Sequence, residues 1–384
     1  MKILTVLTYY RPHTSGLTIY AERLAEAFAA RGHEVTVLTS HFDKRSASEE
    51  IKNGVKIVRA PVALRISKGV IMPTFGLLAW KYVMENDVIH LHLPQFDAPG
   101  FAFRGRLLGK KTILTYHCDL QLPSGLFNRI VNKVVDFQNT MAANLANHIV
   151  TYTQDYCDHS PFLSMYKKKL TPILPPVVLP PTTAEDEQAW LAAHQLDSDD
   201  ATPIIGMATR FATEKGVEIL LSAMPAILQK FPKAKVLFAG QHENVMGEQH
   251  YFERLWPKIA EYQNTGHWQF LGNQTPAEMV AYYKKIDLLI VPSLNSTEAF
   301  GLVQIEAMMH GKPSIASALP GVRRPVQMTG MGLVTPIGNV DALSKAVIEV
   351  LSDHEKFVGD VAEISKTYLP DSIAAKYEEL IASL

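Results

Sequence analysis

Short apolar runs rich in Val, Ile and Leu alternate with helical patterns along most of the chain, and this alternation limits the fold more than any other feature. The first cycle runs from a strand at 3–7 through a helix at 19–31 to a strand at 34–39. Continuous apolar strands are typical of a parallel sheet that helices cover on both faces. We therefore predict the α/β class, with doubly wound, Rossmann-like sheets.

A proline-rich segment at 170–181 divides this alternation into two series. Proline stiffens the chain and removes backbone donors, which favours an extended linker. Strands are predicted again after it, at 204–208, 235–240, 287–292 and 313–316. A chain of 384 residues is also too long for one ordinary core. We expect one domain at 1–175, a second at 176–360 and an amphipathic terminal segment at 361–384, with ligands bound in the cleft beyond the strand ends.

Composition narrows the class of protein. Hydrophobic residues make up 47% and charged residues 20%, as in globular proteins, and the formal net charge of −1 gives no global attraction to nucleic acid. The two cysteines, Cys118 and Cys157, exclude a disulfide framework and suit a reducing cytoplasm. The apolar stretch at 69–80 is interrupted by Pro73 and is too short to span a membrane. We expect a cytoplasmic protein without a transmembrane segment.

Two glutamates, Glu298 and Glu306, lie eight residues apart after an apolar strand, and the residues at 299–310 favour a helix. Glu298 would then lie near the start of that helix, and Glu306 about 12 Å further along its axis. This separation suits the two ends of one elongated ligand better than a close acid/base pair. Three backbone amides at the helix start would bind a ligand oxygen: those of Phe300, Gly301 and Leu302.

Either glutamate alone could be an ordinary helix charge, but the strand–loop–helix context favours a ligand site. The segment resembles the E-x7-E signature of the family 4 retaining glycosyltransferases, which have the GT-B fold, and is similar to bacterial members. The resemblance implies that Glu298 contacts hydroxyls of the donor sugar and Glu306 the ribose of the nucleotide. Phe300 and Gly301 would offer their backbone amides to the same donor.

The segment 207–216 carries a second match to this family, in Arg210, Lys215 and Gly216. A guanidinium and an ammonium at a strand end can neutralise a diphosphate leaving group without a metal. Considered without Glu298, the two could equally be surface cations. Thr209 stands where the family often has glycine, a minor departure. The resemblance assigns these residues to the donor diphosphate.

The N-terminal half carries weaker matches. Gly16 lies where the family has a glycine-containing donor-phosphate loop, although the usual glycine pair is reduced to one and the loop lacks the G-x-G-x-x-G fingerprint. His117 matches a histidine that faces the reacting centre and positions donor or acceptor. His90 and His92 precede it at another strand end. The three histidines could hold a metal, but packing beside the sheet is favoured and no metal or other cofactor is expected.

Other candidate features are interpreted as ordinary structure. Cys118 follows His117 on a strand and points to the opposite face, so a nucleophile role is rejected. The D-x-D match at Asp197–Asp200 precedes its strand and indicates a solvated loop. Basic clusters at 104–111 and 167–169 are typical of a surface. Together with the amphipathic stretch at 126–135 they could also contact anionic lipid, as in family members with lipid acceptors.

The resemblance implies a metal-independent, retaining hexosyltransferase of cell-envelope polysaccharide biosynthesis. The C-terminal domain would bind a UDP- or GDP-linked sugar, with backbone near Gly272 and Asn273 facing the base. The N-terminal domain would bind a glycan, lipid or small-molecule hydroxyl acceptor, and the terminal helix would cross back to it. The resemblance leaves open whether the protein also makes peripheral contact with the inner face of a membrane. Alternatives are a nucleotide-sugar epimerase or a sugar phosphorylase with the same fold, and a nucleotide-sugar sensor without turnover.

Overall fold

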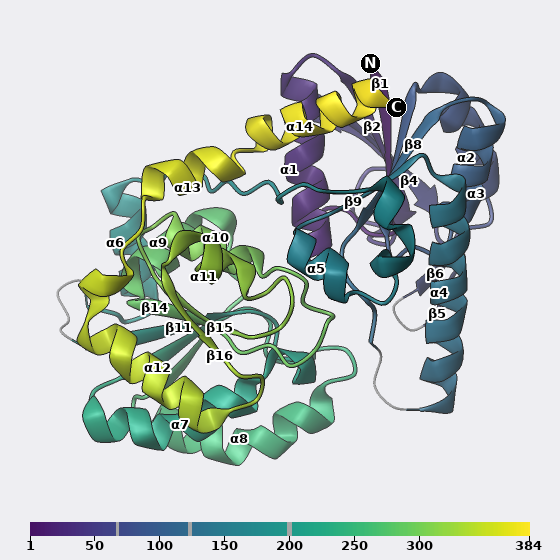
Figure 1. Cartoon of the computed structure of the whole chain (residues 1–384). Coiled ribbons are helices and arrows are strands. Elements are labelled where there is room, and N and C mark those ends of the chain that lie inside the picture. Colours follow the sequence, from purple (N-terminus) through teal and green to yellow (C-terminus); the bar gives the residue numbers. More distant parts are fainter. Residues whose placement is uncertain (67–68, 122–124, 198–201) are drawn as a thin grey trace. The chain divides into compact units, whose positions relative to one another are not determined.

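A computed structural model describes residues 1–66, 69–121, 125–197 and 202–384, which form two compact units (Figure 1). The first unit contains residues 1–177 together with 368–384, and the second contains residues 178–367. The chain therefore passes between the units twice, at Val177–Val178 and at Thr367–Tyr368. These points lie close to the sequence-based limits of 175 and 360, and the terminal helix belongs to the first unit.

The first unit is built on one eight-stranded sheet in the order β10-β9-β8-β7-β1-β2-β4-β3. All its neighbouring strands are parallel except β3, which pairs antiparallel with β4. The strands are β1 (Lys2–Val6), β2 (Glu34–His41), β3 (Glu49–Lys52), β4 (Val55–Pro61), β7 (Val88–Leu93), β8 (Lys111–Tyr116), β9 (His148–Thr151) and β10 (Leu170–Pro172). A separate hairpin joins β5 (Leu64–Ile66) to β6 (Gly69–Ile71).

Helices cover this sheet, and the alternation of apolar strands with helices explains why. Residues of β1 and β7 are buried almost throughout, so both faces of the sheet need a covering layer. The helices are α1 (Gly16–Ala30), α2 (Phe75–Glu85), α3 (Ala98–Leu107), α4 (Leu126–Leu145), α5 (Gln154–His159), the 3-10 helix η1 (Leu163–Lys169) and α14 (Pro370–Ser383).

The terminal helix α14 packs beside α1 (Figure 1). The hydroxyl of Tyr377, which is buried, lies 2.6 Å from the hydroxyl of Tyr20 on α1 and 2.8 Å from that of Thr115 on β8. On the same helix, Glu378 accepts two hydrogen bonds from Arg31, at 2.7 and 2.8 Å. These contacts tie residues at opposite ends of the sequence into one unit.

The second unit has a six-stranded, fully parallel sheet in the order β13-β12-β11-β14-β15-β16. The strands are β11 (Ile204–Ala208), β12 (Lys235–Ala239), β13 (Trp268–Gly272), β14 (Leu288–Val291), β15 (Ser314–Ser317) and β16 (Gly332–Thr335). The helices are α6 (Ala184–Ala193), η2 (Thr213–Lys215), α7 (Val217–Lys230), α8 (Gln249–Asn264), α9 (Pro276–Lys285), α10 (Leu302–Met308), α11 (Arg324–Thr329), α12 (Val340–Ser352), η3 (His354–Phe357) and α13 (Val361–Tyr368).

The predicted α/β class with two Rossmann-like sheets is confirmed, and two local expectations need correction. The proline-rich segment does not begin as a linker, because Leu170–Pro172 pairs with β9 as an edge strand. The helix expected at 299–310 is shorter and begins at Leu302, after Gly301 in the left-handed region. The D-x-D match lies mostly outside the described residues. Among the helices that the structure describes, none is long and apolar enough to cross a membrane.

Candidate donor-binding site

The residues predicted to bind the sugar donor follow two neighbouring strands of the second unit, at one edge of the sheet. Strand β11 pairs in parallel with β14, so the carboxyl ends of both strands lie at the same edge of the sheet. Arg210 and Lys215 follow β11, and Glu298 follows β14. The Nζ of Lys215 lies 2.5 Å from Oε2 of Glu298. The structure therefore joins the two sequence motifs through a direct ion pair.

A tight turn after β11 presents Lys215. Residues Thr213–Lys215 form the 3-10 helix η2, and Gly216 follows with φ +67°. A Cβ at Gly216 would stand 2.2 Å from the carbonyl oxygen of Pro292, so a side chain cannot fit there. The amide of Leu294 donates to the carbonyl of Glu214 at 2.9 Å. Glycine is required at this position because the turn lies directly against the β14 loop.

A buried carboxylate holds the other end of the turn. Glu248, at the N-terminal end of α8, accepts hydrogen bonds from the backbone amide of Thr213 at 3.0 Å and from its hydroxyl at 2.7 Å. Only 8% of Glu248 is exposed. Sequence reasoning missed this residue because 35 positions separate it from Thr213 and no motif marks it.

Arg210 has its own carboxylate partner in Glu214, four residues along the chain. The side chain of Glu214 is 13% exposed and that of Arg210 is 39% exposed. With the Lys215–Glu298 pair, the site holds two cations and two carboxylates. Residues Thr209, Lys215, Glu298 and Val303 also line one narrow cavity. The motif positions thus converge, and Glu214 is an addition that sequence reasoning did not consider.

One of the three amides predicted to bind a ligand oxygen has a partner within the loop. The backbone N–H of Gly301 donates to Oε1 of Glu298 at 3.0 Å, so Glu298 itself occupies this donor. The side chain of Gln304 bonds the carbonyl of Phe300 at 3.0 Å and fixes the same loop. Because α10 begins only at Leu302, Glu298 lies in the loop before the helix rather than on it.

Glu306 lies on α10 and is buried, with 7% of its surface exposed. Its Oε2 accepts a hydrogen bond from the hydroxyl of Tyr283 on α9, at 2.8 Å. Tyr283 is itself fully buried and was not anticipated from the sequence. This bond fixes the orientation of the Glu306 carboxylate, and its contact with a ribose stays a prediction.

Gly272 is the last residue of β13, the edge strand of the same sheet, and Asn273 follows it. Gly272 has φ +71°, and its carbonyl accepts a hydrogen bond from the amide of Gly240 at 2.7 Å. Both residues thus lie at the strand edge that carries Arg210, two strands away in the sheet order. Base recognition there stays a prediction.

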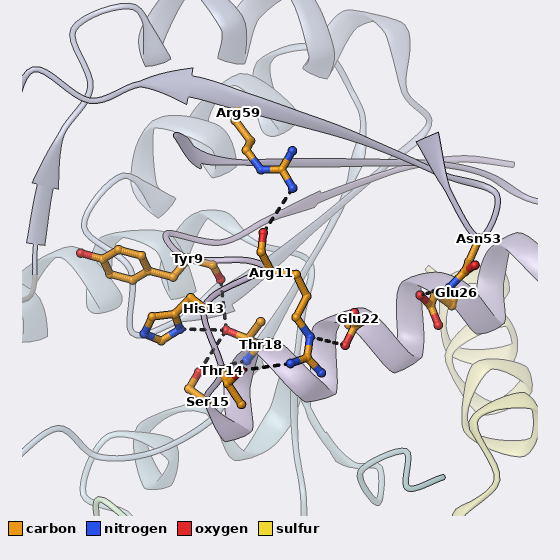
Figure 2. A network of polar contacts seen from close by, with 10 residues as sticks. All are labelled: Tyr9, Arg11, His13, Thr14, Ser15, Thr18, Glu22, Glu26, Asn53 and Arg59. Atoms are coloured by element: carbon orange, nitrogen blue, oxygen red, sulfur yellow. Dashed lines mark hydrogen bonds and ion pairs between the residues drawn. The ribbon is translucent and has the colours of Figure 1, made fainter. Parts of the chain in front are cut away.

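In the first unit, the loop between β1 and α1 is shaped by its own side chains (Figure 2). Gly16 is the first residue of α1, and the hydroxyl of Ser15 caps this helix by accepting from the amide of Thr18 at 3.2 Å. Arg11 donates to Glu22 at 2.6 Å, and its carbonyl accepts from the buried Arg59 at 3.2 Å. These contacts organise the loop around Arg11, where the sequence has one glycine instead of two.

His117 lies in a buried polar network, and its place beside the reacting centre stays a prediction. Its Nε2 lies 2.9 Å from Nδ1 of His92, and its Nδ1 contacts the hydroxyl of Tyr152. His117 is 5% exposed, and burial lowers its pKa to about 3. Both ring nitrogens are therefore engaged within the unit, and the imidazole is neutral near pH 7.

The rings of His90 and His92 have centroids 4.3 Å apart with their planes tilted by 39°, and the two residues alternate on one strand. Nε2 of His90 lies 2.7 Å from the hydroxyl of Thr115, and burial lowers the His90 pKa to about 3. In the part of the chain that the structure describes, no group of three or more His, Cys, Asp or Glu side chains could hold a metal ion. The two histidines pack and hydrogen-bond within the core.

Lysines of the basic clusters have structural partners, so the interpretation of these clusters as plain surface charge is incomplete. The Nζ of Lys111 donates to the carbonyl of Ile381 in the last turn of α14, at 2.8 Å. The Nζ of Lys169 donates to the carbonyls of Ala143 and Ala146 at the end of α4, the latter at 3.2 Å. A cation at a helix C-terminus satisfies orphan carbonyls and complements the helix dipole.

Comparison with protein families gives two matches that follow each other along the chain. Residues 14–173 match the model described as Glycosyltransferase Family 4, and residues 189–362 match the model described as Glycosyl transferases group 1. The first covers most of the first unit, and the second covers most of the second unit.

Known proteins of similar sequence and structure carry related descriptions. A phosphatidyl-myo-inositol mannosyltransferase of Mycolicibacterium smegmatis is 22% identical over 95% of this chain and 89% of its own length. A 2-deoxystreptamine N-acetyl-D-glucosaminyltransferase of Streptomyces fradiae is 25% identical over 90% and 85%. Among solved structures, HepE of Anabaena in complex with UDP has a TM-score of 0.76 at 18% identity, and a sucrose-phosphate synthase from Thermosynechococcus elongatus has 0.77 at 21%. Both cover 100% of each chain.

Proposed function

The chain belongs to the family 4 glycosyltransferases of the GT-B fold, and on that premise we propose that it moves a hexosyl unit from a nucleoside-diphosphate sugar to an acceptor hydroxyl, with retention and without a metal. A UDP- or GDP-linked donor is supported by the named relatives, since HepE was solved with UDP and a Mycobacterium tuberculosis relative is described as GDP-mannose-dependent. The acceptor would be a hydroxyl of a glycan, a lipid or a small molecule.

The observation that carries this proposal is the pair of cations after β11, one of which is paired with the glutamate that follows the neighbouring strand β14. Arg210 offers a planar fork of N–H donors, and Lys215 offers a compact charge held 2.5 Å from Glu298. A diphosphate bound by both cations would have its negative charge neutralised. This charge grows as the nucleoside diphosphate departs, so the cations would stabilise the leaving group. Glu298, anchored by the Gly301 amide, would face the donor sugar next to that diphosphate.

The proposed transfer exchanges one bond at the anomeric carbon for another. The bond between this carbon and the diphosphate oxygen breaks, and its electron pair leaves with the nucleoside diphosphate. The acceptor oxygen bonds to the same face of the carbon, and its proton passes to the departing diphosphate. Arg210 and Lys215 stabilise the charge that accumulates in this step, which is the main catalytic contribution that the site offers.

The first unit supplies the acceptor side of this proposal. His117 would act there through its network with His92 and Tyr152, which keeps the ring neutral and fixed in orientation. Gly16, at the exposed start of α1, would allow donor phosphate to approach the helix N-terminus.

In the second unit, Glu306 and the Gly272–Asn273 backbone would bind the ribose and the base of the donor. These assignments extend the proposal and depend on donor binding by the second unit.

Peripheral membrane contact is the further part of the proposal, and α4 is the element that favours it. Its exposed apolar side chains fall within an arc of about 80° at the helical period of 100° per residue: Leu126, Ile130, Val134, Phe137 and Met141. Arg129 and Lys133 lie exposed along one border of this stripe. None of the described side chains from 126 to 138 is buried. An anionic lipid surface would cover the apolar stripe and pair with the cations.

Vesicle flotation tests the membrane part by itself. The protein should float with vesicles containing anionic phosphatidylglycerol and stay behind with pure phosphatidylcholine. An Ile130→Ser/Phe137→Ser variant should lose flotation, while Ile51→Ser, which removes another exposed apolar side chain, should keep it. Equal flotation of all three proteins would contradict a role for α4.

A transfer assay tests the enzymatic proposal. Release of nucleoside diphosphate is measured with UDP- and GDP-linked hexoses, with and without a mixture of glycan, polyol and lipid acceptors, and with or without EDTA. We expect acceptor-dependent release that EDTA leaves unchanged, with a product whose anomeric configuration by NMR matches the donor. Conversion of the donor sugar without acceptor would indicate an epimerase. Phosphate-dependent release would indicate a phosphorylase, and binding without turnover a sensor.

A further inference from the structure

The donor site contains one charge that the proposed function does not use. Arg210 and Lys215 suit a diphosphate, and Glu298 is assigned to the sugar, but Glu214 has no role in holding an anionic ligand. Its carboxylate is nonetheless paired with Arg210, the cation with the more exposed side chain of the two. An acidic group next to a diphosphate site repels the ligand, so its presence there needs a physical explanation.

The fold keeps Glu214 close to Arg210. The carbonyl of Glu214 accepts a hydrogen bond from Leu294 at 2.9 Å, which ties its backbone to the β14 loop. The preceding residue, Thr213, is held twice by the buried Glu248. Gly216 leaves no space between the turn and Pro292. The backbone of the turn is thus fixed from two sides, and the Glu214 side chain, at 13% exposure, has little freedom to move into solvent.

We propose that Glu214 is an internal counter-ion of Arg210 that weakens binding of the free nucleoside diphosphate more than binding of the nucleotide sugar. This inference rests on the proposed function of the site. Before the donor binds, the Glu214 carboxylate occupies the guanidinium. When the donor is bound, Glu214 stays near the diphosphate as a fixed negative charge, and its effect depends on the charge that the ligand carries.

The two ligands differ in this charge. In a nucleotide sugar both phosphates are esterified and carry about one negative charge each. In the free diphosphate the terminal phosphate loses a second proton near pH 6, which brings the total close to three charges at pH 7.5. Repulsion from one fixed carboxylate grows in proportion to the ligand charge. Glu214 therefore disfavours the product relative to the substrate, which favours product release after transfer.

Replacing Glu214 with glutamine isolates this effect. Glu214→Gln keeps the shape and leaves an amide oxygen that can accept from Arg210, so the geometry is retained and only the charge is lost. The matched control is Glu349→Gln, which removes a carboxylate paired with Lys356 at 2.6 Å on α12 of the same unit. Melting temperatures without ligand show whether each variant is folded.

Titration calorimetry at pH 7.5 and fixed salt gives the Kd of the nucleoside diphosphate and of its sugar ester for the three proteins. We expect Glu214→Gln to bind the free diphosphate about 30-fold more tightly and the nucleotide sugar about 10-fold more tightly, a ratio of logarithms near three to two that follows the charges. Glu349→Gln should match the wild type. The inhibition constant of the product should fall with its Kd.

The results that would overturn this inference differ from those that would overturn the proposed function. A positioning role for Glu214 would make both ligands bind the Glu214→Gln variant more weakly, and this result overturns the inference. Unchanged affinities, or equal tightening for both ligands, overturn it as well. If the wild type binds nucleotides and transfers sugar in each of these cases, the proposed function stands. If neither wild type nor variant binds any nucleotide tested, the proposed function fails and the inference fails with it.

Discussion

The ammonium of Lys215 lies 2.5 Å from the carboxylate of Glu298, although 83 residues separate them in the sequence. Lys215 belongs to the turn after β11, and Glu298 to the loop after β14, the neighbouring strand of the same sheet. Each residue alone could be a surface charge. Their pairing at 16% and 22% side-chain exposure shows that the fold brings two distant motifs into one half-buried site.

Removal of Glu298 should affect stability and activity together. Glu298→Gln leaves Lys215 without its charged partner in a half-buried place, and we expect the free energy of unfolding to fall by about 1–3 kcal/mol. If the carboxylate also contacts the reacting sugar, the transfer rate should fall about 100-fold or more. Denaturant unfolding and initial rates measure the two effects. A fully active Glu298→Gln variant would exclude a catalytic role for this residue.

Glu248 should act through the turn that presents Lys215. Glu248→Ala leaves the amide and the hydroxyl of Thr213 without their buried acceptor, which costs about 1–3 kcal/mol of stability. The donor KM should rise because the turn loses its anchor. Glu248→Gln retains an acceptor oxygen and should recover most of the donor affinity. Equal donor KM values for wild type and Glu248→Ala would show that the turn does not need this support.

The buried histidines of the first unit predict a dependence of stability on pH. Burial lowers the pKa values of His90 and His117 to about 3, from 6.5. Between pH 6.5 and 3 the unfolded chain therefore binds more protons than the folded unit, so stability is full above 6.5 and falls as the pH decreases. Each of these histidines contributes about 1.4 kcal/mol per pH unit within that window.

Unfolding between pH 7 and 4.5 measures this slope before most carboxylates titrate. In His90→Gln the slope of unfolding free energy against pH should be smaller by one proton than in wild type. Identical slopes in the two proteins would show that His90 does not stay neutral in the folded unit.

The docking of α14 should contribute measurably to the first unit. Tyr377→Phe removes the hydroxyl that contacts both Tyr20 and Thr115 within the core, and the expected loss in unfolding free energy is about 1–3 kcal/mol. The control is Tyr262→Phe in the second unit, which also removes a tyrosine hydroxyl and whose side chain is buried on α8. A Tyr377→Phe variant as stable as wild type would show that the hydroxyl network adds no stability.

The features that the sequence reveals are those encoded locally. The apolar runs of β11 and β14 predict parallel strands. Arg210, Lys215 and Glu298 were found because they belong to motifs with fixed spacing. The structure then brings them together through strand pairing between β11 and β14, which no local pattern specifies.

Other features depend on contacts between distant segments and could not be predicted. Glu248 holds Thr213 across 35 residues, and Tyr283 orients Glu306 across 23. The sequence predicts too early a start for α10, because the residues from Ala299 onward favour a helix. In the structure the Gly301 amide donates to the Glu298 carboxylate, and the helix begins only at Leu302. The burial of His117 likewise arises from its partners His92 and Tyr152, which lie on other strand ends.

A thermal-shift titration with UDP, GDP and their hexose esters tests the central claim most directly, in wild type and in an Arg210→Ala/Lys215→Met variant. A nucleotide at 100 times its Kd should stabilise the wild type by about 2.7 kcal/mol. For a unit of this size, that corresponds to a rise in melting temperature of about 5–10 °C. The account predicts this rise with at least one nucleotide in the wild type and its absence in the double variant. Equal shifts in both proteins, or no shift in the wild type with any nucleotide, would contradict donor binding by Arg210 and Lys215.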